Sequence, residues 1–484
     1  MKKKKIVFCY FAPKEIDYTP TDIGYVIAIL NQKFLSGYEF EIVQLSYEIT
    51  KGEEDGGGKI RKKIIQKDVD LIGHQNPDAV FLFIENVLWS KVFAFGRAKS
   101  VMKELRRRHQ GLFIGLQSHK IQIDQMRNIL DENYADCIIN GDPERAFCQL
   151  SYILERKRVP GVCYSMKTYQ ENFREESDRE RCSLADNLDD IPSPYLEHVF
   201  DAHIQDCQAR LGNSFRAFLV SSRGCSFGCF YCSRSVKFEK VRYFSPKRFY
   251  DELEYLFDQF GVYRFFVLDD AFLYSKQRLL EFEKEFENRL MVNPSMERIC
   301  LTIMARPETI DKEVVEILAK LNVKYIQIGL QTINPKLQHY MKRTIDVGYF
   351  SQIREWLYKY DIELYLDVII GLPGDSVEWC KKTVCYALSL DPFFFQVKQL
   401  YLNPNTLFQL RRLEYAIEIE QSEMEFDVPC VIRASGVDSK YFDEMNDFIM
   451  QKIAANPQVY WRYISKQKLF LSDGLYRDQK NTLV

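Results

Sequence analysis

Residues 215–400 of this 484-residue chain repeat a short apolar run followed by a helical segment six times. Repeated units of this kind form right-handed crossovers between parallel strands. Six of them predict an incomplete barrel, and functional groups in such barrels gather at the C-terminal ends of the strands. The predicted strands are Phe215–Ser221, Tyr263–Leu268, Cys300–Ala305, Lys324–Gly329, Glu363–Ile370 and Phe394–Leu400.

The N-terminal third also alternates short apolar runs with helical segments. Continuous apolar strands separated by helices indicate a parallel sheet that is covered on both faces. We therefore expect a doubly wound domain over residues 1–164, with the glycine-rich segment Glu53–Lys62 as a surface loop. Its predicted strands are Ile6–Tyr10, Phe40–Leu45, Ala79–Ile84, Leu112–Leu116 and Cys137–Ile139.

The two predicted domains are joined by a connector over residues 165–211. Its stretch Asp189–Tyr195 contains two prolines, one residue apart, which hold the backbone extended. The partial barrel then occupies residues 212–410, and residues 411–484 are expected to form a small C-terminal α+β region. That region could cap the barrel or only cover one of its edges. The whole chain is thus predicted to be an α/β protein.

Composition limits the classes of protein to which the chain can belong. The formal net charge of -2 gives no bulk attraction to nucleic acid or membrane. No apolar run reaches the ~20 residues that a membrane-spanning helix needs. The 13 cysteines are an odd number in a long chain, which favours reduced thiols over a disulfide framework. We expect a cytoplasmic protein with neither a membrane nor a nucleic-acid partner.

The motif that carries chemistry follows the first strand of the predicted barrel, at Cys225, Cys229 and Cys232. Three thiols within eight residues can wrap one corner of a cubane iron–sulfur cluster, and Gly224 and Gly228 let the backbone approach it. Three protein ligands leave one iron open, as a catalytic centre requires. The sequence therefore predicts a catalytic iron–sulfur cluster on these three cysteines.

Two other interpretations of the cysteines remain. A structural zinc ion takes four protein ligands, and Cys207 is a conceivable fourth, although it lies well before the strand. A structural zinc also has no reason to occupy the mouth of a barrel. A cluster that only carries electrons or senses a signal is the second alternative, and it would not need an open iron.

The Cys-x3-Cys-x2-Cys loop, with Tyr231 before its last cysteine, resembles the radical S-adenosylmethionine (SAM) superfamily over roughly residues 212–405. The resemblance implies a 4Fe–4S cluster whose open iron binds the amino and carboxylate groups of SAM. One electron then cleaves the sulfonium and yields a 5′-deoxyadenosyl radical that abstracts hydrogen from a substrate. A low-potential donor such as flavodoxin or ferredoxin would supply that electron.

The resemblance also implies roles for residues at the other strand ends. Asp269 and Asp270 follow the second strand, where the family binds the methionine amino group, often through Gly-Gly-Glu instead. Carboxylates there can still pair with an ammonium group, although an Asp-Asp pair can also be a solvated loop.

Three further strand ends match the family more weakly. Arg306 and Gln331 would lie near the carboxylate or ribose of SAM, in direct contact or one layer behind it. The stretch Ile370, Gly371 and Leu372 would pass its backbone against adenine. A glycine there allows a close approach, although it could also mark only a turn.

The N-terminal domain resembles the subgroup of this superfamily that binds cobalamin. The likeness rests on Ser118 and His119 after the fourth strand, on Gly141 and Glu144 after the fifth, and on the proline-containing connector. The resemblance implies that these strand-end turns contact cobalamin, because such sheets bind ligands there. No Asp-x-His-x-x-Gly motif follows the first strand, which leaves open that this domain has lost the cofactor.

The leading functional hypothesis is a cobalamin-type radical SAM enzyme that methylates an unactivated carbon of a peptide or natural-product intermediate. The alternative is a radical SAM enzyme that does not methylate but cyclises, rearranges, epimerises or oxidises its substrate. The sequence does not identify the substrate, the residues that act on it or the oligomeric state.

Overall fold

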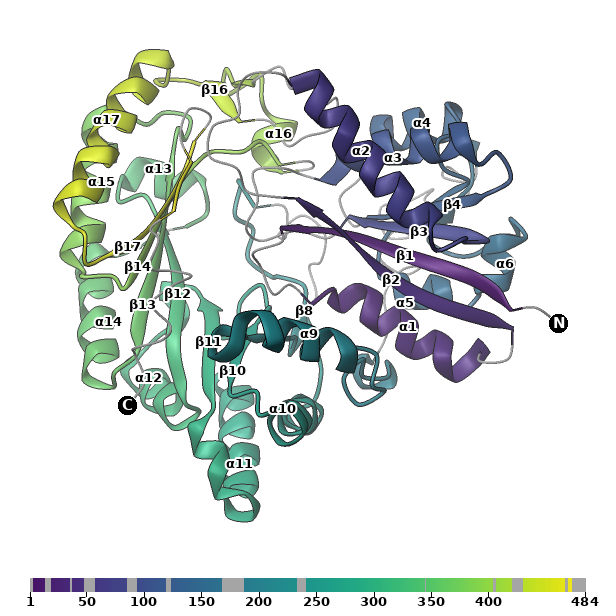
Figure 1. Cartoon of the computed structure of the whole chain (residues 1–484). Helices are drawn as coiled ribbons and strands as arrows, with labels where there is room; N and C mark the ends of the chain where they lie inside the picture. The colour runs from purple at the N-terminus through teal and green to yellow at the C-terminus, as the bar shows by residue number, and fades with distance from the viewer. Residues whose placement is uncertain are drawn as a thin grey trace. The chain divides into compact units, whose positions relative to one another are not determined.

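A computed structural model describes residues 3–13, 19–34, 37–47, 57–84, 94–118, 123–167, 187–232, 241–343, 345–403, 406–419, 430–465 and 469–471 (Figure 1). The chain divides after Ala202 into two compact units, each described by itself below. The second unit comprises His203–Gln421 and Pro429–Val484.

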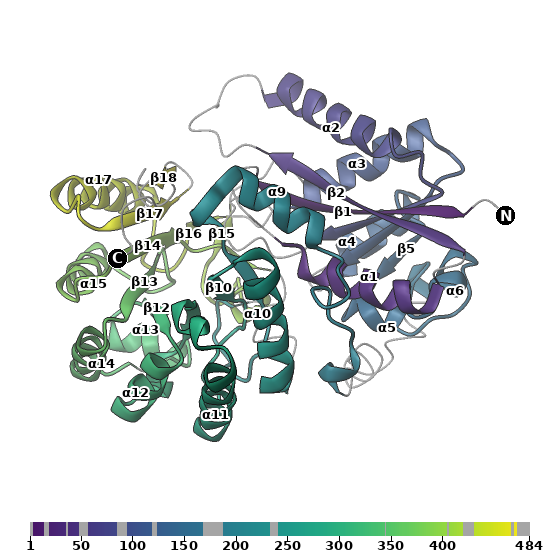
Figure 2. The same ribbon diagram turned by 60° about the horizontal axis from the view of Figure 1, so that its bottom comes forward.

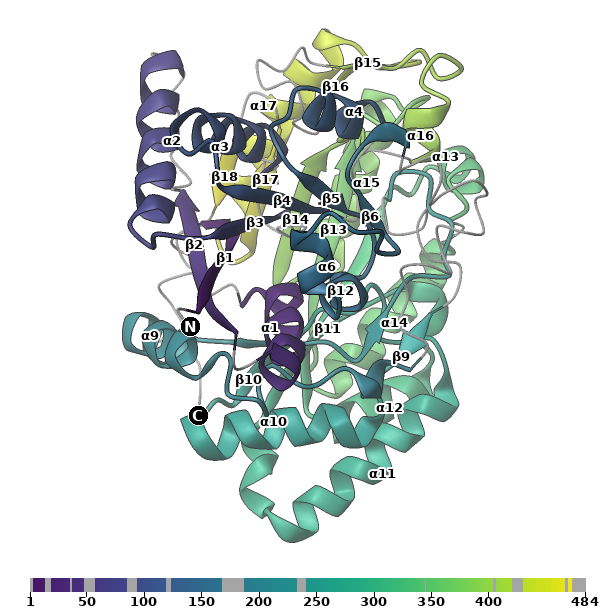
Figure 3. The ribbon, with the colours of Figure 1, turned by 90° about the vertical axis from the view of Figure 1, so that its right-hand side faces the viewer.

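The first unit is built on a six-stranded sheet with the strand order β2-β1-β3-β4-β5-β6 (Figure 3). Neighbouring strands are parallel, except that β6 runs antiparallel to β5. The strand order changes direction at β1 and β3, the place at which open sheets of this class bind ligands. The strands are β1 (Lys4–Pro13), β2 (Tyr38–Tyr47), β3 (Ala79–Ile84), β4 (Phe113–Ser118), β5 (Cys137–Ile139) and β6 (Val162–Cys163).

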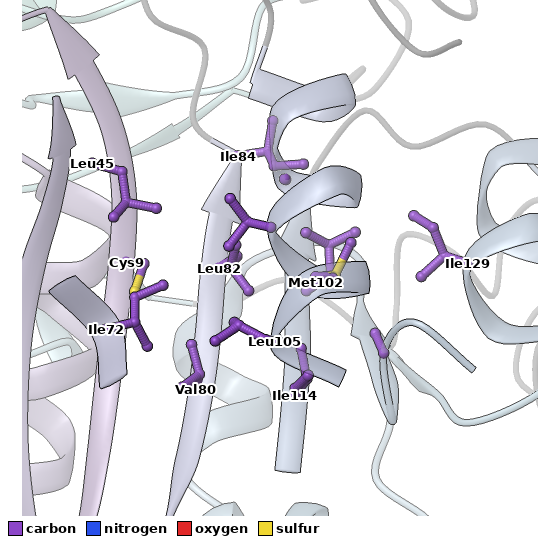
Figure 4. Packing of buried hydrophobic residues seen from close by; sticks show 14 of the residues in the cluster. Cys9, Leu45, Ile72, Val80, Leu82, Ile84, Met102, Leu105, Ile114 and Ile129 are labelled. Atoms are coloured by element: carbon purple, nitrogen blue, oxygen red, sulfur yellow. The ribbon is translucent and has the colours of Figure 1, made fainter. Parts of the chain in front are cut away.

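Helices cover both faces of this sheet (Figure 2). On one face, apolar residues of α2, α3 and α4 pack against the strands, as Ile72, Met102 and Ile129 do over Val80 and its neighbours (Figure 4). On the other face, Phe147 packs its ring edge against Phe8 and Phe81. The helices are α1 (Thr21–Phe34), α2 (Gly57–Gly73), α3 (Ala94–Arg108), α4 (Ile123–Asp131), α5 (Pro143–Phe147) and α6 (Leu150–Leu154).

The second unit is built on an eight-stranded sheet with the order β18-β17-β14-β13-β12-β11-β10-β7. Seven strands are parallel and curl into a half-barrel, and β18 closes one edge antiparallel to β17. The strands are β7 (Ala217–Leu219), β10 (Arg264–Val267), β11 (Cys300–Ala305), β12 (Val323–Gln331), β13 (Glu363–Ile370), β14 (Phe394–Gln399), β17 (Tyr460–Ile464) and β18 (Leu469–Leu471).

Helices line the outer face of the half-barrel, as Figure 2 shows for α10, α11, α12, α14, α15 and α17. Side chains alternate between the two faces, as parallel strands require. On β13, Leu364 and Leu366 are fully buried toward the helices, whereas Tyr365 and Asp367 lie on the inner face. The helices are α9 (Asp201–Leu211), α10 (Pro246–Phe260), α11 (Lys276–Val292), α12 (Lys312–Lys320), α13 (Pro335–Tyr340), α14 (Val347–Lys359), α15 (Val377–Ser389), α16 (Leu407–Leu410) and α17 (Ser439–Ala455).

Side-chain caps fix where these helices begin. Ser245, Ser275, Asp311 and Ser376 each accept a backbone N–H from the residue three positions later. Such caps satisfy backbone donors that would otherwise lack a partner. Small hairpins complete the unit, namely β8 (Ser222–Arg223) with β9 (Arg242–Tyr243) and β15 (Glu418–Ile419) with β16 (Val431–Arg433).

The predicted fold class is confirmed, with two local differences. The segment Glu53–Lys62 is not a loop throughout, because α2 begins at Gly57 and includes Lys62. The six predicted barrel strands are joined by β17 from the C-terminal region, which therefore extends the sheet. No helix among the described residues is long and apolar enough to cross a membrane.

Candidate functional site

The cysteine loop, residues 224–232, follows β7 and β8 at the C-terminal end of the half-barrel strands. Cys225 and Cys229 are buried and Cys232 is half-buried, and none of the three forms a disulfide with another described residue. A turn closes the loop, since the Cys232 amide donates to the Cys229 carbonyl at 3.1 Å. The three thiols are thus presented on one short, ordered segment.

Contacts from the segments that follow two separate strands, β10 and β14, hold the cysteine loop in place. After β10, the Tyr274 hydroxyl donates to the Gly224 carbonyl at 3.0 Å, and its ring stacks on Phe227. After β14, the Asn403 side chain donates to the Tyr231 carbonyl at 3.4 Å. The Phe408 amide likewise donates to the Phe230 carbonyl at 3.3 Å.

Two buried arginines point at the middle cysteine. Arg306, after β11, places Nη1 3.1 Å from the Cys229 sulfur, and its guanidinium lies over the Phe227 ring. Arg343, after α13, places Nη1 3.9 Å from the same sulfur and 3.2 Å from the Tyr231 hydroxyl. Cationic neighbours stabilise the thiolate, which is the form that binds metal.

Arg343 is a residue that the sequence analysis missed. It lies outside the strand-end motifs, in the turn that follows α13. Only the folded structure shows that its side chain contacts Cys229. Its Nη2 also donates to the Gly329 carbonyl. The basic run Met341-Lys342-Arg343 is the one signal in the sequence, and it does not distinguish Arg343 from its neighbour.

Cys225, the first cysteine of the loop, has different surroundings from those of Cys229. Burial raises the pKa of Cys225, while the Tyr274 hydroxyl and the Phe227 amide oppose that rise. The nearby Asp270 carboxylate raises the pKa of Cys225 further. Since a cation that neutralised this charge would favour the thiolate, the Cys225–Asp270 neighbourhood suits a positively charged ligand.

Asp269 and Asp270 have different structural roles. The Asp269 carboxylate is fully buried and accepts hydrogen bonds from the amides and hydroxyls of Ser221 and Ser222, at 2.5 to 2.9 Å. Burial raises the pKa of Asp269 to about 6, although these four bonds oppose the rise. Asp269 therefore fixes the start of the cysteine loop, whereas Asp270 lies near Cys225.

Gln331 ends β12 with a left-handed backbone, at φ 62°. Its side chain folds back over Gly329, where a Cβ would overlap the Gln331 amide. Among the described residues, the buried Oε1 of Gln331 and Nε of Arg343 have no hydrogen-bond partner. These two orphaned polar atoms lie in the same neighbourhood, because Arg343 also contacts Gly329.

The turn Ile370, Gly371 and Leu372 is fixed by α17. Gly371 has φ 82°, and a Cβ there would lie 2.7 Å from the Phe442 ring. Its amide donates to the Tyr441 hydroxyl at 3.2 Å, which in turn donates to Asp375 at 3.2 Å. Ile370 and Leu372 are fully buried on either side.

The strand ends of the first unit also carry buried polar groups. Ser118 ends β4, and Glu144 lies in the first turn of α5, where both are buried. Gly141, with φ 106°, brings the backbone between them, and its carbonyl accepts from the Gln117 amide at 3.4 Å. His119 lies outside the described residues.

Comparison with known proteins identifies the part of the chain that surrounds the cysteine loop. Residues 219–385 match the family model of the Radical SAM superfamily. The chain carries a radical SAM domain. This domain implies a 4Fe–4S cluster and SAM as its cofactors.

Curated proteins are also similar to part of this chain. An uncharacterised methyltransferase of Pyrococcus horikoshii is 25% identical over 283 residues, which are 58% of this chain and 58% of the relative. The heme chaperone HemW of Bacillus subtilis is 27% identical over 158 residues, which are 31% of this chain and 41% of the relative. The chain thus spans about half the length of the curated relatives that it matches.

Two solved structures share the fold beyond the radical SAM domain. The radical SAM methyltransferase TsrM of Kitasatospora setae superposes with a TM-score of 0.62 at 16% identity, over 86% of this chain and 79% of that one. The cobalamin-dependent SAM radical enzyme OxsB superposes with a TM-score of 0.64 at 13% identity, over 94% of this chain and 67% of that one.

The donor set of the cysteine loop fits an iron–sulfur cluster better than a single metal ion. Among the described residues, no three Cys, His, Asp or Glu side chains converge closely enough to hold one ion. In a cubane each cysteine binds a different iron, so its thiols need not converge on one point. Cys207, the conceivable fourth zinc ligand, instead contacts His203 and Arg210 of its own helix α9.

The surroundings of the loop also fit SAM. The molecule carries a sulfonium, an ammonium and a carboxylate, and it would need partners of both charges. Asp270 supplies negative charge beside Cys225. Arg343, which contacts Cys229, and Gln331, which folds over Gly329, each hold an orphaned polar atom.

Proposed function

We propose that Cys225, Cys229 and Cys232 bind the 4Fe–4S cluster of a cobalamin-dependent radical SAM methyltransferase. When bound, cluster, SAM and cobalamin would together supply a 5′-deoxyadenosyl radical and a methyl group for an unactivated carbon. The observation that carries this proposal is the cysteine loop with Arg306 and Arg343 at its middle thiol.

Each side chain around the loop has a specific role in this proposal. Arg306 and Arg343 place positive charge at the Cys229 sulfur, where it would offset the negative charge of a bound cluster, and the Tyr231 hydroxyl orients Arg343. Burial raises the pKa of Tyr231, so it acts as a neutral phenol.

SAM would be held by groups of both charges at the strand ends. Asp270 would pair with its ammonium group, since it is the carboxylate beside Cys225. Gln331 Oε1 would accept from the ligand, and the Gly371 turn would face adenine. Asp269, which the sequence placed with Asp270, acts instead by fixing Ser221 and Ser222.

Cobalamin binding is supported by the first unit and by two comparisons. TsrM was solved with cobalamin and a 4Fe–4S cluster bound, and OxsB with aqua-cobalamin and SAM. In this chain, Ser118, Gly141 and Glu144 gather at the sheet edge, and the buried Oε1 of Gln117 has no partner among the described residues. An orphaned acceptor there fits the amide side chains of a corrin ring. His119 belongs to the same proposed site.

The partners follow from the chemistry. The substrate would be a small molecule or a peptide with an unactivated carbon, in the cytoplasm. A low-potential donor such as flavodoxin or ferredoxin would supply the electron that SAM cleavage consumes. The methyltransferase assignment is supported by the relative in Pyrococcus horikoshii and by TsrM.

The experiment that tests this proposal is metal analysis after anaerobic reconstitution with iron, sulfide and hydroxocobalamin. About four irons per chain and about one cobalt are expected. Gly141→Val should lower the cobalt without lowering the iron, because φ 106° is unfavourable for a side chain. Gly111→Val is the matched control, since a Cβ at Gly111 meets nothing within 4 Å. Four irons without cobalt would contradict cobalamin dependence and favour a radical reaction without methyl transfer.

A further inference from the structure

The inner face of the half-barrel carries one lysine in an apolar row. Lys398 is the last but one residue of β14 and is paired in register with Ile369 of β13 and Ile464 of β17. Strand alternation confirms its orientation, because Val397 beside it is fully buried toward the helices. Lys398 itself keeps part of its surface accessible to solvent. It is therefore a cation on the inner face, flanked on both sides by isoleucines.

The neighbouring carboxylate does not neutralise this lysine. Asp367, one row nearer the N-terminal end of the sheet, accepts from Gln327 Nε2 at 2.6 Å and from Gln396 Nε2 at 2.5 Å. Within the described part of the chain, Lys398 forms neither a hydrogen bond nor an ion pair. A cation in such surroundings is costly unless an anion pairs with it.

Two residues before Lys398 on the same face of β14 lies a hydrogen-bond acceptor that also lacks a partner. Gln396 is 1% exposed, and its Oε1 has no hydrogen-bond partner among the described residues. The amide orientation is fixed, because the Asp367 carboxylate can only accept and must therefore face the NH2 group. Leaving such a buried acceptor unsatisfied destabilises the folded chain, so a donor is expected there.

The remaining charges on this face are mostly positive. Arg462 of β17 lies in register with Gln396, and Arg264 of β10 and Arg216 lie near Tyr365 one row further down. Burial lowers the pKa of Lys398 to about 8, with Asp367 opposing and Arg462 adding to that change. A bound anion would reverse the change, because an opposite charge favours the protonated amine.

Lys398 is also close in sequence to the cysteine loop's anchors. Five residues after it, Asn403 donates to the Tyr231 carbonyl, and Phe408 bonds to the Phe230 carbonyl. The C-terminal ends of parallel strands meet at one edge of the sheet, and Lys398 lies near that end of β14, as the cysteine loop lies beyond that end of β7. A molecule held there would lie within the same unit as the three cysteines.

We propose that Lys398 and Gln396 bind an anionic group and an adjacent N–H of the substrate, as in an N-acylamino acid or a peptide carboxylate. The two side chains lie two residues apart on one strand face, about 6–7 Å along the strand. Lys398 pairs with the anionic oxygens, and Gln396 Oε1 accepts from the neighbouring N–H. The inference rests on the proposed function, since it places the substrate in the half-barrel of a radical SAM domain.

The test measures how fast Lys398 is acylated by trace acetic anhydride in the anaerobically reconstituted full chain, by peptide mass spectrometry. The probes are N-acetylglycine, its uncharged amide N-acetylglycinamide, and inorganic phosphate. N-acetylglycine should slow acylation of Lys398 roughly tenfold at saturation, in line with a charged hydrogen bond. N-acetylglycinamide should have no effect, and neither probe should protect Lys312, which is exposed on α12.

Ligand-observed NMR provides the second measurement. Saturable binding of N-acetylglycine should be lost in Lys398→Met and kept in Lys398→Arg, because arginine retains the charge. Protection by phosphate alone would assign the anion to a phosphate rather than a carboxylate and would still support an anion site. Equal acylation with and without every probe would overturn the inference, as would equal protection of Lys312.

A further measurement distinguishes a failure of the anion site from a failure of the proposed function. Formation of 5′-deoxyadenosine from SAM is measured in the same preparation without a probe. If it forms while no probe protects Lys398, the anion site is wrong and the proposed function stands. If Lys398 is protected but no 5′-deoxyadenosine forms, the site stands and the proposed function is wrong.

Discussion

Arg306 donates a hydrogen bond from Nη1 to the Cys229 sulfur at 3.1 Å, and Glu308 holds its other two nitrogens. Two constraints therefore fix this guanidinium, the carboxylate on one side and the Phe227 ring beneath it. Such hydrogen bonds to a ligand sulfur tune the reduction potential of an iron–sulfur cluster. Arg306 would therefore make the proposed cluster easier to reduce.

Replacing Arg306 by methionine should make the cluster harder to reduce. The reduced cluster carries more negative charge and gains more from the donor. Such a hydrogen bond contributes roughly 1.5–3 kcal/mol, and only the part that favours the reduced cluster changes the potential. Its loss should therefore lower the potential by up to about 65–130 mV for a one-electron couple. Redox titration followed by electron paramagnetic resonance measures this. Arg306→Lys, which keeps the charge, should fall between the two, and an unchanged potential in Arg306→Met would contradict the role.

Tyr441→Phe should destabilise the turn at Gly371. The Tyr441 hydroxyl is the acceptor for the Gly371 amide, and the variant leaves that buried donor unsatisfied. Such a loss costs about 1–3 kcal/mol, so hydrogen exchange at the end of β13 should accelerate. The control is Tyr358→Phe, which removes an exposed hydroxyl on α14. Equal exchange in both variants would show that Tyr441 does not hold the turn.

The raised pKa of Asp269 predicts how the free energy of unfolding depends on pH. Its folded pKa of about 6 lies above the ordinary value of 3.8, so the folded state binds the proton more tightly. The contribution of this carboxyl to stability is therefore fully present below about pH 4 and is lost as the pH rises through about 6. The difference in urea midpoint between the natural protein and Asp269→Asn should fall over that window. A difference that stays constant or rises with pH would contradict the assignment.

Much of the fold is predictable because strand runs and helical periodicity are strong in this chain. Ala79–Ile84, Cys300–Ala305 and Glu363–Ile370 are strands with the predicted bounds. The glycines at the start of α2 suggest a loop, but the helix begins at Gly57 because Val69 and Ile72 bury one of its faces. Strand pairing across a long sequence separation is not visible in a local pattern.

β17 illustrates that limit. Tyr460–Ile464 pairs with β14 after 60 intervening residues, and its charged Arg462 interrupts the run of apolar and aromatic residues. Trp461 packs against Phe395 on the outer face, at 4.9 Å between ring centroids. The segment belongs to the sheet because of these tertiary contacts, and nothing in its own composition assigns it there.

The candidate site is predictable only in part. The cysteine spacing points to the loop, because three thiols on one short segment have few other uses. The roles of Asp269 and Asp270 differ through burial and hydrogen bonding, which identical side chains in sequence cannot reveal. Arg343 and Lys398 could not be singled out in the sequence, because the contact of Arg343 with Cys229 and the position of Lys398 in the sheet exist only in the folded chain.

The most direct test is the formation of 5′-deoxyadenosine from SAM by the reconstituted chain under dithionite. Product is expected from the natural protein and none from Cys225→Ala, Cys229→Ala or Cys232→Ala. Full activity is expected from Cys385→Ala, which changes an exposed cysteine on α15. Product from any of the three loop variants at the natural rate, or none from the natural protein, would contradict it.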